Sequence, residues 1–257
     1  MRTLIASAAA IALATLVFAD DKIGKTPAPT ILAKSTQDLR KLPGYHFKYS
    51  GSVGEYSLET TGTVWNNGLV KQVPTTGSEI WRKDKAAFAK DKNGRYVGAA
   101  SQGQQEQAIA NSPTPDALLN EALAVGKLAK FAQDEEVDGK ECKVIEAHAP
   151  EAKLREYMET MAKYWRPEMA AMAKRIQIND KESYMIYRVF VSKDDLVIRK
   201  IVRETKVVLA DSVLRSMPEA AAVNGQLDQV LTVDLMKHGE ELDEEIPAEI
   251  KKLLQVK

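Results

Sequence analysis

The sequence is poor in cysteine and histidine, with one cysteine and three histidines among 257 residues. Cys142 has no partner for an internal disulfide, so apolar packing has to hold the fold together. We expect its thiol to be buried as a small apolar group rather than to act as a nucleophile. His46, His148 and His238 are far apart and never at the four-residue spacing of a helical zinc site. We therefore expect no metal site.

Sequence motifs for catalysis are missing as well. The chain has no Gly-x-Ser-x-Gly nucleophile turn and no glycine-rich loop for phosphate. Two acidic clusters, Asp134-Glu135-Glu136 and Asp243-Glu244-Glu245, could pair carboxylates or hold calcium, but neighbouring acids more often form a solvated turn. We therefore expect a protein that is not an enzyme and has no cofactor.

The charges of the chain balance, with 36 basic and 36 acidic residues. Proteins that bind nucleic acid or an anionic membrane surface usually carry a basic excess, so we expect no nucleic-acid partner. No internal repeat and no Pro/Ser-rich linker divides the main part of the chain. We expect a flexible segment over residues 20–30, followed by a single α+β domain over residues 31–257.

The first residues have the composition of a secretory signal peptide. Met1-Arg2-Thr3 is a short positive start, Leu4 to Phe18 is apolar, and Ala19 ends a small-residue cleavage site. The apolar run is shorter than the roughly 20 residues of a membrane-spanning helix, and no second run follows. We expect a signal peptide over 1–19, no transmembrane anchor in the mature chain, and a periplasmic or secreted protein. The residue after cleavage is Asp20 rather than the Cys of a lipoprotein, so no lipid anchor is expected.

Alternation of apolar and polar residues predicts antiparallel strands. Tyr45, Phe47 and Tyr49 alternate with polar residues, which gives a strand one apolar and one solvated face. Further alternating strands are expected to about Val97, and again over 184–191, 196–209 and 227–236. Tight turns are predicted at three dipeptides that tolerate positive φ angles, Asn67-Gly68, Asn93-Gly94 and Asp138-Gly139.

Helical spacing appears in four places. It predicts a short N-terminal helix up to Pro43-Gly44, a helix capped by Thr114 or Asp116 that ends near Gly126, and a C-terminal helix that begins at Pro247. The C-terminal helix is expected to bury Ile250, Leu253 and Leu254. The fourth helix follows Pro150, and Pro167 is expected to kink or break it.

This fourth helix carries a stripe of methionine and aromatic residues. Such a stripe is most often core, but unbranched, polarizable Met side chains can also repack around ligands of varying shape. Both interpretations hold if the helix lies over a curved sheet and leaves an apolar cavity for an acyl chain. The candidate residues for the walls of that cavity come from the strands and from this helix: Tyr45, Phe47, Leu58, Val64, Trp81, Met158, Met161, Trp165, Met169, Met172, Leu231 and Val233.

The order of elements and four segments carry a family resemblance. The segments are Leu42-Pro43-Gly44-Tyr45-His46-Phe47, Gly77-Ser78-Glu79-Ile80-Trp81 through Asn93-Gly94-Arg95-Tyr96, Val137-Asp138-Gly139-Lys140 and Ile246-Pro247-Ala248-Glu249. Over essentially the whole mature chain, the sequence resembles the superfamily of periplasmic lipoprotein carriers of the LolA/LolB type and the related mycobacterial LppX-like, lipid-carrying lipoproteins. The resemblance implies a strongly curved antiparallel sheet, an incomplete β-barrel, whose concave face is covered by helices and holds acyl chains. The missing lipidation Cys and the long Met-rich helix depart from that pattern.

Two functions follow from these observations. The first is a soluble periplasmic carrier or chaperone that binds a lipid or the acyl chain of a lipoprotein. The alternative is a non-enzymatic sensory or regulatory module on the same fold, which would bind an envelope protein partner through the Ala-rich segment 210–226.

Overall fold

The fold was analysed in a computed structural model, which describes residues 25–53, 56–162, 177–210, 226–240, 242 and 244–256. The predicted signal peptide and most of the 210–226 segment lie outside the described residues. The same is true of the predicted cavity residues Trp165, Met169 and Met172, and of Pro167. In the part of the chain that is described, no helix has the length and apolar character needed to cross a membrane.

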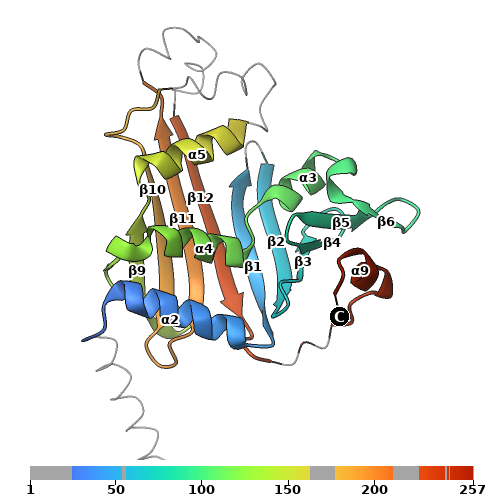
Figure 1. Ribbon diagram of the computed structural model, residues 1–257, viewed down its shortest axis with the longest axis horizontal. Helices are drawn as coiled ribbons and strands as arrows, with labels where there is room; N and C mark the ends of the chain where they lie inside the picture. The colour runs from blue at the N-terminus through green and yellow to red at the C-terminus, as the bar shows by residue number, and fades with distance from the viewer. Residues whose placement is uncertain are drawn as a thin grey trace, which may run out of the picture.

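The described strands form one antiparallel sheet that does not close into a barrel (Figure 1). Its strands, in chain order, are β1 (Gly44–Val53), β2 (Tyr56–Trp65), β3 (Val70–Pro74), β4 (Ile80–Lys83), β5 (Ala86–Lys90), β6 (Tyr96–Gly98), β7 (Lys130–Phe131), β8 (Glu135–Val137), β9 (Lys140–His148), β10 (Tyr184–Ser192), β11 (Ile198–Val208) and β12 (Gln226–Met236). The spatial order is β6-β5-β4-β3-β2-β1-β12-β11-β10-β9-β7, and β8 also pairs with β9. The chain therefore brings its last strand beside its first, and the predicted fold class, α+β with a curved open antiparallel sheet, is confirmed.

Four of the described helices cover one face of this sheet, and a fifth, the C-terminal one, packs on the other face. The helices are α2 (Ala28–Lys41), α3 (Gln104–Asn111), α4 (Pro115–Val125), α5 (Glu151–Ala162) and α9 (Ala248–Leu253), with short 3-10 turns η1 (Ala99–Ser101) and η2 (Gly126–Leu128). Figure 1 shows α2, α4 and α5 lying one above another across the strands β9 to β12. The C-terminal α9 lies beside the β3–β4 end of the sheet.

The predicted strands are confirmed by the structure, and both the alternation along the strands and the turn conformations agree with the prediction. Along β11, the residues at every second position from Ile201 to Val207 are buried. The turn glycines Gly68 and Gly94 have φ angles of 80° and 77°, and Asp138 also has a positive φ in the β8–β9 hairpin. These are the left-handed conformations that the Asn-Gly and Asp-Gly dipeptides favour.

The helix predictions hold with specific differences. Thr114 caps α4, since its hydroxyl accepts a hydrogen bond from the backbone N–H of Ala117 at 3.2 Å. The N-terminal helix begins at Ala28, inside the segment expected to be flexible. Leu253 of α9 is 38% exposed rather than buried, whereas Ile250 and Leu254 are buried against the sheet as expected. The sequence analysis missed α3, whose sequence QQEQAIAN has too few apolar residues to show a helical period.

Buried apolar residues form separate clusters on the two faces of the sheet. The main cluster lies under α2, α3, α4 and α5 and includes Phe47, Leu119 and Val233. A second cluster lies between β4 and α9, around Trp81 and Ile250. Cys142 is fully buried in a third, small cluster with Val144 and Phe190, as expected.

His238 makes the stability of the fold sensitive to pH. Its Nε2 lies 2.9 Å from the carbonyl oxygen of Ile198, and burial followed by the charge of Arg199 lowers the pKa of the imidazole. The ring is therefore neutral in the folded chain, whereas in the unfolded chain it gains a proton below about pH 6.5. The stability that depends on a neutral His238 is present above that pH and is lost as the pH falls towards the lowered pKa of the folded state.

We predict that His238→Gln reduces the loss of unfolding free energy between about pH 7 and about pH 5. Urea unfolding of the variant and the parent at both pH values measures this difference. His148, which is exposed, supplies the control His148→Gln. An equal pH dependence in the parent and in His238→Gln would contradict the prediction.

Candidate functional site

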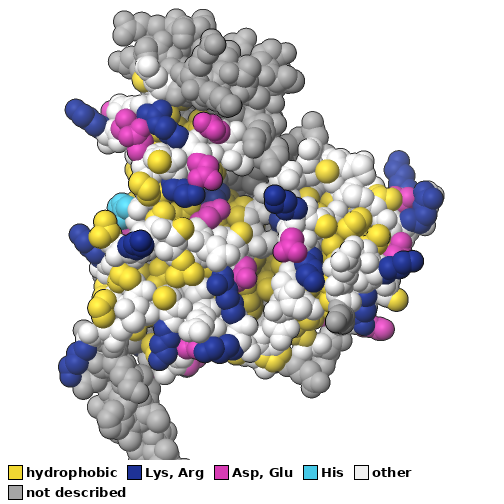
Figure 2. Space-filling view, in the orientation of Figure 1, with side chains coloured by type: hydrophobic (Ala, Val, Ile, Leu, Met, Phe, Trp, Pro, Cys, Tyr) yellow, Lys and Arg dark blue, Asp and Glu magenta, His cyan; other side chains and the backbone are white. Residues whose placement is uncertain are grey.

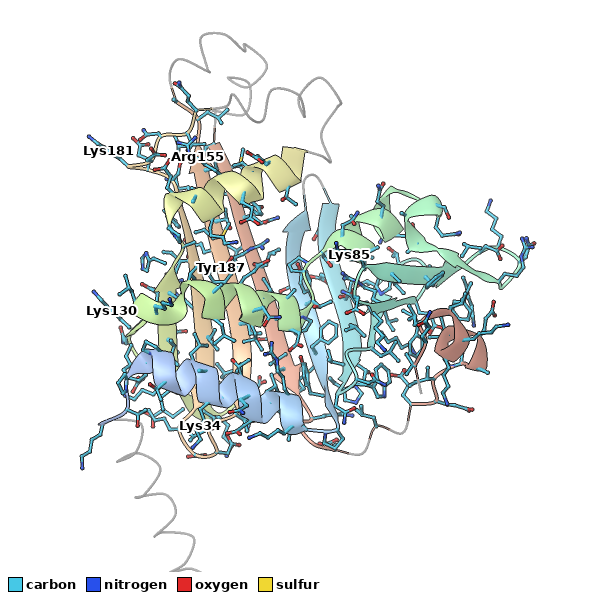
Figure 3. All side chains as sticks on the ribbon, in the orientation of Figure 1. Lys34, Lys85, Lys130, Arg155, Lys181 and Tyr187 are labelled. Carbon is cyan, nitrogen blue, oxygen red and sulfur yellow. The ribbon has the colours of Figure 1, made fainter. Side chains whose placement is uncertain are left out.

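A cleft of about 400 Å³ lies between α4 and α5 on the helix-covered face of the sheet. In Figure 3, Tyr187 of β10 is labelled in the space between these two helices. The residues that line the cleft come from α4, α5, the β4 region and three central strands: Arg82, Asp84, Asn111, Ser112, Pro113, Thr114, Ala117, Glu121, Ala124, Val125, Lys153, Glu156, Tyr157, Thr160, Met185, Tyr187, Arg203 and Gln229. A volume of this size is typical of small-molecule sites.

Neighbouring strands supply a polar floor to the cleft. Arg203 of β11 stands beside Tyr187 of β10 in the strand register, and Gln229 of β12 is paired with Thr205 of β11. Arg203 and Gln229 are 6% and 5% exposed. Alternation along their strands points both side chains towards the helices, at positions that most of the neighbouring inward residues fill with apolar side chains.

The helices α4 and α5 form the roof of the cleft, and each contacts the polar floor through one side chain. From α4, the Glu121 carboxylate accepts a hydrogen bond from the Tyr187 hydroxyl at 3.0 Å and one from Nη1 of Arg203 at 3.2 Å. From α5, the Tyr157 hydroxyl donates to Oε1 of Gln229, and the Arg203 guanidinium lies 5.1 Å from the centre of the Tyr157 ring. The roof is therefore attached to the floor by hydrogen bonds and a cation–π contact as well as by apolar packing.

The tyrosines of the cleft act as hydrogen-bond donors. Burial raises the pKa of Tyr187, and the charge of Glu121 adds to the effect. Burial also raises the pKa of Tyr157, against the opposing charge of Arg203. Both hydroxyls therefore keep their protons at neutral pH, and neither can serve as a base there.

Charge is distributed unevenly with depth in the cleft. Arg82 and Arg203 are buried, at 8% and 6% exposure. The acidic side chains lie towards solvent, since Glu121 is 41% exposed and Glu156 is 65% exposed. Figure 2 shows charged side chains of both signs among hydrophobic ones on this face of the molecule. The cleft thus combines an outer zone that contains acids with a basic interior.

The acidic clusters of the sequence pair with lysines. The Asp134 carboxylate accepts hydrogen bonds from Lys143 and binds Lys193, both at 2.8 Å. Glu244 binds Lys71 and also accepts a hydrogen bond from Thr63 at 3.0 Å. Among the described residues, no group of His, Cys, Asp or Glu side chains is arranged to hold a metal ion.

The structure brings most of the described cavity candidates together, but beneath the helices and not along the cleft. Six of them belong to the main cluster: Tyr45, Phe47, Val64, Met158, Leu231 and Val233. Trp81 is separated from these six, because it faces α9 on the other side of the sheet. Leu58 is paired with Gly51 in the β1–β2 register and Met161 lies in α5, but their side chains are outside the description. The candidates with described side chains all differ from the residues that line the cleft.

The sequence analysis missed the polar residues of the cleft floor. These residues could have been found as polar side chains at the inward-facing positions of alternating strands. Arg203 follows Ile201 in this way on β11, and Gln229 lies between Leu227 and Leu231 on β12. A charged or amide side chain at an inward position of an otherwise apolar alternating strand points to a buried polar site.

Comparisons with known proteins return structural matches. No protein-family model matches the chain, and no curated protein sequence matches it. The chain is similar to the lipoprotein LppX of Mycobacterium tuberculosis, with 13% identity over 84% of this chain and 99% of that one and a TM-score of 0.46. It is similar to LprF of Mycobacterium bovis, with 11% identity over 87% and 99% of the two chains and a TM-score of 0.44. It is also similar to a LolA-superfamily protein of Nitrosomonas europaea, with 10% identity over 88% and 97% and a TM-score of 0.31.

The identities are 13% or lower, so the likeness concerns the fold. The function has to be argued from the cleft itself.

Proposed function

We propose that the protein is an exported, non-enzymatic carrier that holds a lipid or the acyl chain of a lipoprotein in the cleft between α4, α5 and the sheet. The observation that carries this proposal is the 400 Å³ hollow between two helices and a curved sheet. Its walls include the apolar side chains of Val125 and Met185 and the rings of Tyr157 and Tyr187. Burial of an acyl chain against such walls contributes about 0.8 kcal/mol per CH₂ group.

The site of action follows from the signal-like sequence over residues 1–19. Cleavage after Ala19 would release a single domain into the periplasm or the medium, with no lipid attached to Asp20. A carrier in that compartment would shield its cargo from water without covalent chemistry, and it would need no cofactor.

Extraction of the purified protein followed by lipid mass spectrometry tests the proposal. Protein isolated from the envelope fraction should contain a defined amphiphile, and emptied protein should take up a fluorescent fatty acid with one-to-one stoichiometry. Protein that is consistently empty and takes up no acyl chain would contradict a carrier role.

Filling the cleft should reduce binding. Ala117 of α4 lines the cleft, and Ala117→Phe would place a ring where the cargo is proposed to lie. Loss of contact equivalent to about two CH₂ groups would weaken binding roughly tenfold. Titration with the fluorescent fatty acid measures this change. The matched control is Ala152→Phe at an exposed position of α5 outside the cleft; equal weakening in both variants would contradict the location of the site.

A further inference from the structure

Arg203 is a buried cation with an incomplete set of partners. Its Nη1 donates to the half-exposed carboxylate of Glu121 at 3.2 Å, and its Nη2 is 3.4 Å from the neutral Oε1 of Gln229. Its Nε is buried and has no hydrogen-bond partner among the residues that the structure describes. A buried guanidinium presents five N–H donors and is costly to leave unpaired.

The surroundings of Arg203 favour a negative charge at the bottom of the cleft. Arg82 is a second buried cation that lines the same cleft, at 8% exposure. The single described carboxylate that contacts Arg203 is Glu121, which reaches it from the roof helix α4. An anionic oxygen that entered the cleft would meet donors that Glu121 leaves unused.

The shape of the cleft suits a molecule with one charged end. Apolar and aromatic side chains, among them Tyr157, Met185 and Val125, line the same cleft as Arg203. Such walls would hold an alkyl chain, while a charged group would be stabilised only where the guanidinium lies.

We propose that Arg203 binds the anionic head, a carboxylate or a phosphate, of an amphiphile whose alkyl chain occupies the cleft between α4 and α5. This inference rests on the proposed carrier function and specifies the class of cargo. Glu121 competes with the head for Arg203, so its carboxylate weakens binding of an anion. In the empty protein, Glu121 fills part of the site and reduces the cost of burying the guanidinium.

The test compares ligands that differ only in the head. Oleate, oleyl phosphate and neutral oleyl alcohol each displace a neutral fluorescent probe from the mature chain, and the ratio of their dissociation constants reports recognition of the head. The parent should bind an anionic ligand about tenfold more tightly than the alcohol, the effect of a charge-assisted hydrogen bond. The better of oleate and oleyl phosphate identifies the head as carboxylate or phosphate.

Two variants with opposite expected effects keep the test decisive. Arg203→Gln should bring the ratio of anion to alcohol affinity close to one and leave the affinity for the alcohol unchanged. Glu121→Gln should raise the ratio, because it removes the competing carboxylate. Glu121 is partly exposed, so this variant can be measured even if Arg203→Gln fails to fold. The control is Arg188→Gln on the opposite face of β10, where Arg188 pairs with Glu146 and Glu204, and it should behave as the parent does.

The outcomes separate the two proposals. Equal affinity for the anions and the alcohol in the parent, or a ratio that Glu121→Gln leaves unchanged, would overturn the role of Arg203 while the carrier function stands. Failure of all three ligands to bind would overturn the carrier function and, with it, the role of Arg203.

Discussion

Replacing Trp81 with alanine is expected to lower the free energy of unfolding by about 3–5 kcal/mol, the usual cost of removing a large buried aromatic side chain. The ring is 1% exposed, lies 5.6 Å from the ring of Trp65, and donates through Nε1 to Glu79 at 3.1 Å. It also packs in the cluster that holds α9. The variant should therefore detach the C-terminal helix first, and urea unfolding should show the loss directly.

The same variant tests whether Trp81 lines the ligand cavity, as the sequence predicted, or lies on the opposite face of the sheet. The structure places it on the face opposite the cleft, so the fraction of Trp81→Ala that remains folded should bind oleate as the parent does. Phe131→Ala, which removes a partly exposed ring, is the control and should change stability by about 0.5 kcal/mol or less. Loss of oleate binding by folded Trp81→Ala would mean that Trp81 contacts the ligand, and it would contradict the placement on the opposite face.

Gly62→Ala is expected to cost about 3 kcal/mol or more, because nothing larger than hydrogen fits at this position. A Cβ atom there would lie 2.2 Å from the backbone oxygen of Lys71 and 2.4 Å from Cζ of Phe47. Phe47 is the register partner of Gly62, and its fully buried ring covers the glycine. Backbone atoms of β3 cannot move away without breaking the β2–β3 ladder, so the strain would remain in the sheet.

Gly98→Ala is the matched control for this substitution. Gly98 ends β6 and has no heavy atom within 4 Å of the position that a Cβ would take. Thermal and urea unfolding should therefore separate the two variants clearly. Similar stability of Gly62→Ala and Gly98→Ala would mean that β2 and β3 lie further apart than the structure has them.

Much of the fold could be predicted because local signals agreed with one another. Strict alternation identified β1 and β12, and the Asp138-Gly139 pair fixed the β8–β9 hairpin. The start of α4 was narrowed to a cap at Thr114 or Asp116, and the structure has Thr114 in that position. Such features are set by a few neighbouring residues, so they can be inferred from the sequence alone.

The cleft could not be predicted in the same way. Its central contact joins Glu121 of α4 to Arg203 of β11, residues 82 positions apart in the chain. The sequence analysis sought an apolar cavity and therefore selected apolar residues such as Phe47 and Val233, which fill the core. Trp81 has the same apolar character, but the phase of β4 directs it to the opposite face, and that phase depends on the register with β3 and β5.

The sheet ends on both sides in very short strands, three residues in β6 and two in β7. Unpaired backbone groups on an outer strand are the template on which a second molecule can polymerise. Here β7 and β8 together occupy much of the free side of β9, which would otherwise offer a nine-residue template. A sheet whose outer strands are this short offers little backbone for a second molecule to pair with, so the fold itself opposes fibre growth at high concentration.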